Sequence, residues 1–304
     1  MAQPQATSET PTVRETATVQ ELAARPPFWT RARRRMNPQL VIGLILISLI
    51  LFTTIFASVI SSQNPNALTS AGSLAPPQAG HIFGTDSIGR DIFARVVHGG
   101  RVSLTIAIPS VILALVLGMV LGVPAGYLSG RIDQTIMRLL DVLFAFPGIL
   151  LAMVIVTILG PSIRNLILTI GILYTARMAR IIRAPILAVK NYDYVEAARA
   201  IGSKDSRIVI KHVIPNASSP VIVEVTIALG QVILTETALS FLGLGPPPPN
   251  PSWGAMLSQN RQFMEFASWT VLAPGAAIIV TVASFLMLGH GLRRMLDPRR
   301  RGVK

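Results

Sequence analysis

The sequence predicts an all-α integral membrane protein with six transmembrane helices. Hydrophobic residues make up 51% of the 304-residue chain, and charged residues only 13%. The apolar residues fall into long uncharged blocks, each reaching or approaching the ~20 residues that cross ~30 Å of hydrocarbon. Basic residues bracket these blocks, as is typical of a chain that crosses a bilayer repeatedly. The predicted spans are residues 39–60, 102–127, 140–160, 165–187, 213–243 and 269–290.

The first 36 residues are polar, rich in Thr, Ala, Pro and Glu, and without apolar periodicity. They are predicted to form a mostly disordered cytoplasmic tail. The first transmembrane helix then occupies 37–61. Its apolar run is longer and lies further from the start than in a cleavable signal peptide, so we expect the chain to keep it. An external segment, 62–101, follows.

The second span carries small residues at intervals of four: Ala114, Gly118, Gly122 and Gly126. This spacing places them on one helix face, where they let another backbone approach closely. Helix packing explains the pattern, and a pore-lining or subunit-contact face is the alternative.

The third and fourth spans are separated only by residues 160–164, which predict a tight hairpin because they contain adjacent Gly and Pro. The fourth span carries Arg177, Arg180 and Arg183, so we expect its last turns to stand clear of the lipid. Asp141, near the start of the third span, is expected to cap a helix or pair with Arg138.

The loop between spans four and five, 190–212, predicts two short helices around a glycine corner. Asp193 and Glu196 have the spacing of a capping box, and Gly202 can adopt the left-handed conformation that ends a helix. Ser203 is expected to cap the second helix, with Asp205 near its start. An ordinary capped connector would share these features.

The fifth span contains two acidic residues, Glu224 and Glu236. An ionisable group within a span is costly, so both are candidates for contact with a translocated substrate. The external loop that follows, 244–268, holds a proline run and Trp253. Its stiffness suits docking of an outside partner, and a stiff connector is the alternative.

The distribution of basic residues predicts the orientation. With both termini inside, 22 of the 27 lysines and arginines fall in cytoplasmic segments and five outside. This asymmetry follows the positive-inside rule.

Several classes of protein are excluded or disfavoured. The chain has no Cys and no Gly-Lys pair, so it has neither a thiolate metal site nor a phosphate-binding loop for ATP. His81, His98, Asp86 and Asp91 lack the spacing of a metal site, and Asp86 is expected to be a helix N-cap instead. The net charge of +13 lacks the basic, aromatic-interleaved face of a nucleic-acid binder.

One motif carries a family resemblance. Glu196, Ala197 and Ala198, with Gly202 and Pro215 further on, resemble the EAA motif of bacterial ABC importer permeases. In that family this segment is the coupling helix, which sits in a cleft of the ATPase subunit and transmits its movement. The resemblance implies a coupling role for Glu196, Ala197, Ala198, Ala200, Gly202, Ser203 and Pro215.

Further segments resemble the dipeptide/oligopeptide C-type permeases of this family, and together the motifs cover about residues 80–300. They are 81–91, 236–245 with 251–257, and Leu292 with 296–299. The chain departs from the family at His290 and Arg294, where acidic residues are common, and at Ala94, where serine is usual. The resemblance therefore does not extend to an ion pair at the end of the last helix.

The resemblance implies an ABC type I importer permease (MetI-like) fold, with a permease core over 102–291 and a basic cytoplasmic tail over 292–304. Such a subunit forms half of a path for dipeptides or oligopeptides across the bacterial cytoplasmic membrane. Its implied partners are a homologous second permease, two cytoplasmic ATPase subunits that bind ATP and Mg, and an external substrate-binding lipoprotein or periplasmic protein. The same resemblance implies docking of that external protein at Asp86, Arg90, Asp91 and Trp253.

Other functions stay open on the residues alone. An ion-gradient-driven secondary transporter could use Glu224 as its proton site, and a membrane scaffold would not transport at all. Within the family, nickel or another small solute could replace the peptide.

Overall fold

The computed structural model describes residues 37–296. Within this range the regular secondary structure is helical, and the segment before α5 has only isolated β-bridges. The predictions for 1–36 and 297–304 lie outside the described residues. The long helices are α3 (Pro38–Ile55), α5 (Ile92–Leu128), α6 (Gly130–Phe144), α8 (Ile163–Val189), α11 (Ile214–Phe241) and α13 (Trp269–Leu296). The shorter elements are α4 (Ala57–Ile60), α7 (Gly148–Leu159), α9 (Asp193–Ala200), α10 (Asp205–Ile208), the π-helical turn η1 (Val209–Val213), α12 (Trp253–Asn260) and the 3₁₀ turn η2 (Arg261–Phe263).

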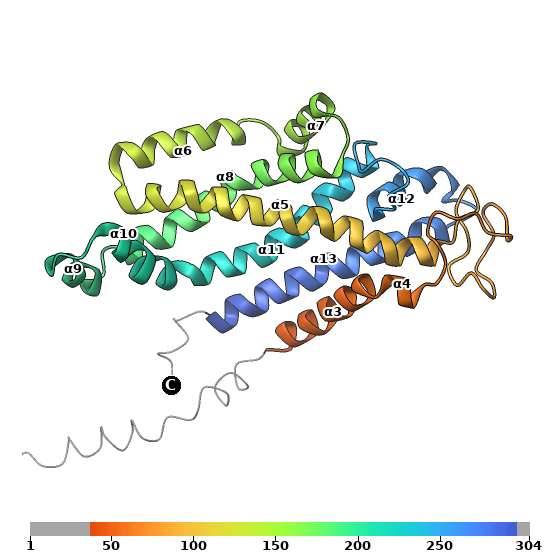
Figure 1. Ribbon diagram of the computed structural model, residues 1–304, viewed down its shortest axis with the longest axis horizontal. Coiled ribbons are helices and arrows are strands. Elements are labelled where there is room, and N and C mark those ends of the chain that lie inside the picture. Colours follow the sequence, from red (N-terminus) through yellow and green to blue (C-terminus); the bar gives the residue numbers. More distant parts are fainter. Residues whose placement is uncertain (1–36, 297–304) are drawn as a thin grey trace, which may run out of the picture.

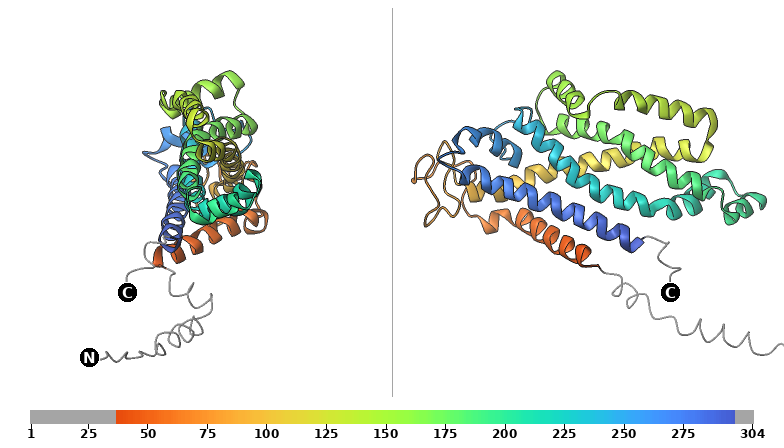
Figure 2. Two further views of the ribbon diagram at one scale, coloured as in Figure 1. Left: turned by 90° about the vertical axis from the view of Figure 1, so that its left-hand side faces the viewer. Right: turned by 180° about the vertical axis from the view of Figure 1, so that it is seen from behind.

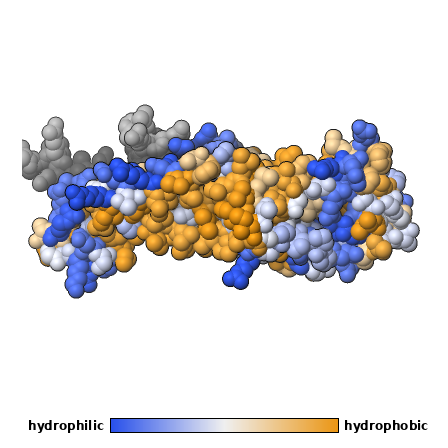
Figure 3. Space-filling view, turned by 90° about the horizontal axis from the view of Figure 1, so that it is seen from above, coloured by the Kyte–Doolittle hydropathy of each residue, from blue (hydrophilic) through white to orange (hydrophobic). Residues whose placement is uncertain are grey.

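The long helices form one elongated bundle (Figure 1). α5 packs most extensively against α8, and α13 packs against both α3 and α11. α6 and α7 form an outer layer on α5 and α8, as the views in Figure 2 also show. On the face drawn in Figure 3, apolar residues occupy the middle of the bundle and hydrophilic residues gather at its two ends. Within residues 37–296, five helices are long and apolar enough to cross a membrane, and the bent pair α6–α7 is a sixth candidate.

The two ends of the bundle carry different elements (Figure 1). α9 and α10 lie at one end, and α3 begins and α13 finishes towards the same side. The segment 61–91 and α12 lie at the opposite end. The structure thus separates the segments that the basic residues predict to be cytoplasmic from those predicted to be external.

The third span, predicted over 140–160, is not one continuous helix. α6 ends at Phe144 and α7 begins at Gly148, with a turn of 82° between them. Pro147 lies at this break, and it has no backbone N–H to continue the hydrogen bonds of α6. The predicted partner of Asp141 is also wrong: this α6 carboxylate pairs with Arg180 of α8.

The boundaries of the other spans differ more modestly. The second span begins at Ile92 instead of residue 102, because Asp91 caps α5 by accepting a hydrogen bond from the Ala94 N–H at 2.7 Å. The first span ends at Ile55 and continues only as the short α4. The last helix extends to Leu296, so the predicted C-terminal tail begins as helix.

The glycine face of α5 packs within this chain. A Cβ added at Gly122 would lie 2.5 Å from the Ala179 carbonyl oxygen, and one at Gly118 would lie 2.7 Å from Cγ of Met178. Ala114 and Gly126 are buried on the same helix. Packing against α8 within this chain thus accounts for the small residues on this face of α5.

Candidate functional site

The loop between α8 and α11 has the predicted glycine corner. Gly202 has φ of +81°, its N–H donates to the Arg199 carbonyl at 3.0 Å, and the Ser203 N–H donates to the Ala198 carbonyl at 3.1 Å. These two bonds form a Schellman motif, which ends α9 by satisfying its last carbonyls. The left-handed conformation predicted for Gly202 is confirmed.

The predicted side-chain caps in this loop are wrong. Tyr192 occupies the N-cap position of α9, and Asp193 is already its first helical residue. The N-cap position of α10 belongs to Lys204, and the N–H of Ser203 takes part in ending α9. Neither helix has a side-chain cap bond. Asp193 and Glu196 still lie in the first turn of α9, where the helix dipole favours negative charge.

One side of α9 faces the chain's own core and the other faces outward. Val195 and Ala198 are buried, so Ala198 is a packing residue in this conformation. The outward positions are Glu196, Ala197, Ala200 and Gly202. Next to them, the side chains of Tyr192 and Tyr194 are exposed and Ile201 is 82% exposed. The loop therefore presents small, aromatic and aliphatic groups on an otherwise polar surface.

The end of α5 holds this loop in place, which the sequence does not predict. The Tyr127 hydroxyl donates to Asp205 Oδ1 at 2.5 Å and accepts from Arg199 Nη2 at 3.3 Å. Lys190 Nζ donates to the Tyr127 carbonyl at 3.1 Å and to the hydroxyl of Ser129. No local sequence signal marks Tyr127, since its partners lie far along the chain.

The loop is also continuous with a membrane-spanning helix. α10, η1 and α11 follow one another without a break, so residues 205–241 form one helical segment. η1 is a five-residue π-helical turn, and such turns inside α-helices often occur at functional sites. Pro215 lies just beyond it and is exposed. A displacement of α9 can therefore pass through the glycine corner to α10, and from α10 into α11 through an uninterrupted helix.

Midway along the bundle, Glu224 of α11 pairs with Arg177 of α8. Glu224 Oε1 lies 2.7 Å from Arg177 Nε, although Oε1 accepts no well-aligned hydrogen bond from residues 37–296. Arg177 Nη1 also donates to Gln231 Oε1 at 2.8 Å. Tyr174 and Thr235 extend this polar row, with their hydroxyl oxygens 3.0 Å apart. Its position in a span predicted Glu224 as a candidate site residue. The sequence did not predict that Arg177 is its partner.

At the end opposite α9, the predicted docking residues belong to a buried polar cluster. Asp86 is fully buried; its Oδ2 accepts a hydrogen bond from Arg90 Nε at 2.7 Å and lies 3.6 Å from Arg95 Nε. Arg95 is also buried, and its Nη1 donates to the Pro65 carbonyl at 3.1 Å. The expected N-cap role of Asp86 is wrong, because Asp91 caps α5 instead.

Asp91 and Trp253 are buried as well. Asp91 Oδ2 lies 2.8 Å from His81 Nδ1, and the Trp253 indole N–H donates to the Val96 carbonyl at 2.8 Å. These side chains hold the segment before α5 and the start of α12 against α5. Because the side chains of Asp91 and Trp253 are buried, they could affect docking of an external protein only by shaping the surface that covers them. Among residues 37–296, no three His, Asp or Glu side chains are grouped as metal ligands would be.

Comparison with known proteins identifies the family. Residues 114–302 match the family described as "Binding-protein-dependent transport system inner membrane component". This chain belongs to that family. The permease is also 42% identical over 273 residues to the dipeptide transport system permease protein DppC of Alkalihalophilus pseudofirmus, covering 89% of this chain and 90% of that protein. It is 41% identical over 276 residues to the glutathione transport system permease protein GsiD of Escherichia coli, covering 90% of each.

The fold of the permease is shared with a solved transporter. A structure described as inward-facing conformations of the MetNI methionine ABC transporter aligns with a TM-score of 0.53 and 18% identity. The alignment covers 67% of this chain and 97% of that chain. The predicted all-α, MetI-like permease fold is thus confirmed.

Glu236, the second acidic residue predicted in the path, is sealed inside the permease. It is fully buried, accepts a hydrogen bond from the Ser240 hydroxyl at 2.7 Å, and lies 3.4 Å from the Ser103 hydroxyl. Ser103 also contacts the Trp253 N–H at 3.4 Å. In this conformation Glu236 therefore joins α11 to α5 and the start of α12, and its side chain is closed off from solvent.

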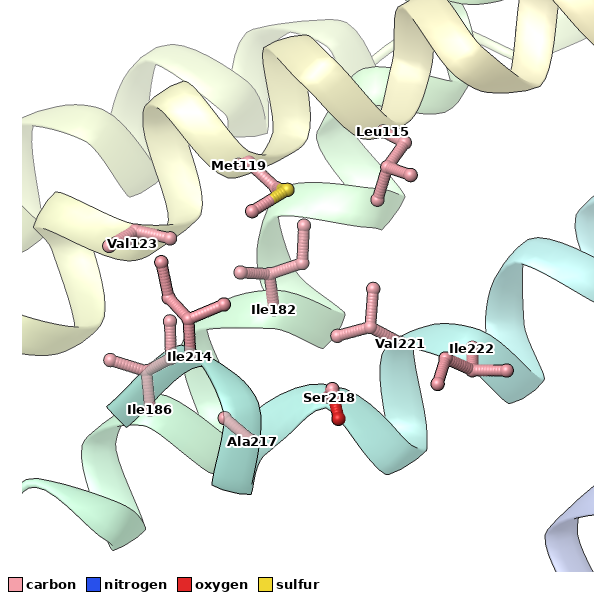
Figure 4. Close-up of a pocket in the computed structure, with 10 residues that line it drawn as sticks. All are labelled: Leu115, Met119, Val123, Ile182, Ile186, Ile214, Ala217, Ser218, Val221 and Ile222. Atoms are coloured by element: carbon pink, nitrogen blue, oxygen red, sulfur yellow. The ribbon is translucent and has the colours of Figure 1, made fainter. Parts of the chain in front are cut away.

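An apolar cavity of about 150 Å³ lies between α5, α8 and the first turns of α11. Figure 4 shows that its walls come from all three helices. The lining residues are Leu115, Met119, Val123, Ile182, Ile186, Ile214, Ala217, Ser218, Val221 and Ile222. The cavity leaves space beside the part of α11 that is directly connected to the loop carrying α9.

Proposed function

We propose that this permease is the C-type subunit of an ABC importer for short peptides, and that α9 transmits the movement of a cytoplasmic ATPase subunit to α11. The observation that carries the coupling role is the outward surface of α9 together with the continuous helical segment 205–241 that follows the glycine corner. The names of the relatives, one for dipeptides and one for glutathione, support a peptide substrate.

The partners are those that the family resemblance implies. Two cytoplasmic ATPase subunits would bind ATP and Mg, for which this chain lacks a phosphate-binding loop, and the permease itself would need no cofactor. A homologous second permease would supply the other half of the path, and an external binding protein would deliver the peptide. The positive-inside rule supports a bacterial cytoplasmic-membrane location with both termini and α9 in the cytoplasm.

The mechanism uses the two features that surround the start of α11. When the ATPases close, α9 would be displaced, and the segment 205–241 would carry the displacement into the membrane as one helix. The apolar cavity beside Ile214 and Val221 gives the first turns of α11 room to repack. Packed interfaces of this kind have discrete arrangements, so a small shift can switch access from one side of the membrane to the other.

A matched pair of substitutions tests the coupling role. Ala197 on α9 and Ala79 in the segment before α5 are both exposed alanines, at opposite ends of the bundle. Ala197→Trp should remove ATPase co-purification and lower uptake of labelled dialanine by roughly tenfold or more, because a 1.4 kcal/mol loss of binding is already tenfold. Ala79→Trp should leave ATPase co-purification unchanged. Full ATPase binding and uptake in Ala197→Trp would refute the proposal.

A further inference from the structure

The Arg177–Glu224 pair lies near the middle of two spanning helices. At 1.5 Å per residue, Arg177 is about 21 Å from the start of α8 and about 18 Å from its end. Glu224 lies about 15 Å along α11 by the same rise. The pair is therefore within the depth of the hydrocarbon if these helices cross the membrane, so Arg177 lies deeper than the cytoplasmic position expected for the last turns of this span.

The two members of the pair differ in exposure. The Glu224 side chain is 10% exposed, whereas that of Arg177 is 41% exposed. Nε of Arg177 faces Glu224 and Nη1 faces Gln231, and no acceptor among residues 37–296 hydrogen-bonds to Nη2. A half-exposed guanidinium at this depth is costly against acyl chains, so this side of the α8–α11 contact should face water or a second subunit.

Neighbouring positions on α8 distinguish this face from the others. One and two turns towards α9, Arg180 and Arg183 pair with Asp141 and Asp133 of α6. Arg177 has no such partner in α6. In the other direction, Ile172 is 40% exposed and lies on roughly the opposite side of the helix. α8 thus presents an apolar exposed side and, at Arg177, a polar one.

We propose that Arg177, held by Glu224 and Gln231, lines the translocation path and contacts the terminal carboxylate of the peptide passing through it. A guanidinium matches a carboxylate through two parallel N–H donors, and Nη2 together with the second N–H of Nη1 presents such a pair. Glu224 is a positioning residue that compensates the charge of Arg177 when no cargo is present. This inference rests on the proposed peptide function and adds the residue that would recognise the cargo.

The first test compares dialanine with dialanine amide, which lacks the terminal carboxylate. Transport is measured in the transporter reconstituted with its own binding protein. The same binding protein serves every variant, so its own selectivity cancels between them. Arg177→Gln should lower dialanine uptake about tenfold or more, as expected for a hydrogen bond to a charged group, and should change amide uptake by less than about twofold. Arg180→Gln is the matched control, because Arg180 lies one turn away and pairs with α6. It should change the uptake of neither dialanine nor dialanine amide.

A reversed pair separates cargo contact from a purely structural role. Arg177→Glu combined with Glu224→Arg keeps an ion pair between α8 and α11 but places a carboxylate on the exposed side. We expect this double variant to assemble normally but to lose the preference of the wild type for dialanine over dialanine amide. Recovery of that preference would overturn the proposal. An equal fall in the uptake of both probes in Arg177→Gln would overturn it as well.

The second test asks whether this face lines the path, and it does not depend on the cargo. The chain has no Cys, so single-cysteine variants have no background. Gln231→Cys should react with a charged methanethiosulfonate reagent in the assembled transporter, and Ile172→Cys should not. Reaction at Ile172 alone would overturn the proposal. If the wild-type transporter carries neither dialanine nor its amide, the proposed peptide function and the proposed cargo contact are both refuted. The labelling result still decides whether Arg177 faces the path.

Discussion

The two ends of this permease are built in opposite ways. At the end carrying the segment 61–91 and α12, charged and polar side chains such as Asp86, Arg95 and Glu236 are buried, and they join segments far apart in the sequence. At the other end, α9 and α10 are mostly exposed, and surface contacts with Tyr127 hold them.

This difference indicates which end can move. Separating buried charges from their partners is strongly unfavourable, so the α12 end should stay rigid as other parts rearrange. Surface hydrogen bonds between exposed groups are weak and open readily. A binding protein would therefore meet a fixed platform, whereas an ATPase would meet a loop that can be displaced.

The largest expected effect comes from removing Asp86. Asp86→Ala would leave the buried Arg95 without its nearest countercharge, which typically destabilises a protein by about 3–5 kcal/mol. We expect a marked fall in the thermal stability of the purified transporter and in the amount of permease in the membrane. Asp205→Ala removes an exposed carboxylate at the α9 end and is the matched control. Equal destabilisation by both variants would contradict the contrast between the two ends.

A smaller effect is expected from backbone strain at Gly202. Both Gly202 and Gly80 have positive φ, of +81° and +85°, and an added Cβ at either position meets nothing within 4 Å. Alanine at each should therefore cost about 1–2 kcal/mol through the left-handed conformation alone. Because α9 depends on its Schellman end, Gly202→Ala should lower the uptake obtained per ATP hydrolysed. Gly80→Ala at the opposite end should leave the uptake per ATP hydrolysed unchanged. If this ratio falls equally in both variants, the α9 end has no special role in coupling.

Much of the fold could be predicted because a bilayer imposes length and apolarity on each span. α8, α11 and α13 lie close to their predicted ranges for this reason. The start of α5 was misplaced because Arg95 and Arg101 suggest a polar loop. Their guanidinium groups donate to the carbonyls of Pro65 and Thr54, contacts that only the folded chain reveals.

The site shows the same division between local and long-range information. Gly202 could be predicted because a glycine after a helical alanine run is a local signal for a helix end. Local pattern does not reveal that Ala198 faces inward while Ala197 faces outward, since this depends on what α9 packs against. For the same reason Glu224 could be singled out from its span, but its pairing with Arg177 could not.

The smallest expected effect tests the anchor of the movable end. Tyr127→Phe removes the hydroxyl bonded to Asp205 and Arg199 and keeps the ring. The bond to Asp205 lies at an exposed site, so its loss should cost no more than about 1 kcal/mol. Global stability should hardly change, but a loosened α9 should raise ATP hydrolysis without cargo and lower the transport-to-hydrolysis ratio about two- to fivefold.

Tyr194→Phe is the matched control for this anchor. Tyr194 is an exposed tyrosine of the same loop, and its hydroxyl makes no hydrogen bond within residues 37–296. The transport-to-hydrolysis ratio should therefore stay at the wild-type value in Tyr194→Phe and fall only in Tyr127→Phe. If the ratio is the same in the two variants, Tyr127 does not restrain α9. The coupling signal would then depend on the helical connection to α11 alone, and the end of α5 would have no part in it.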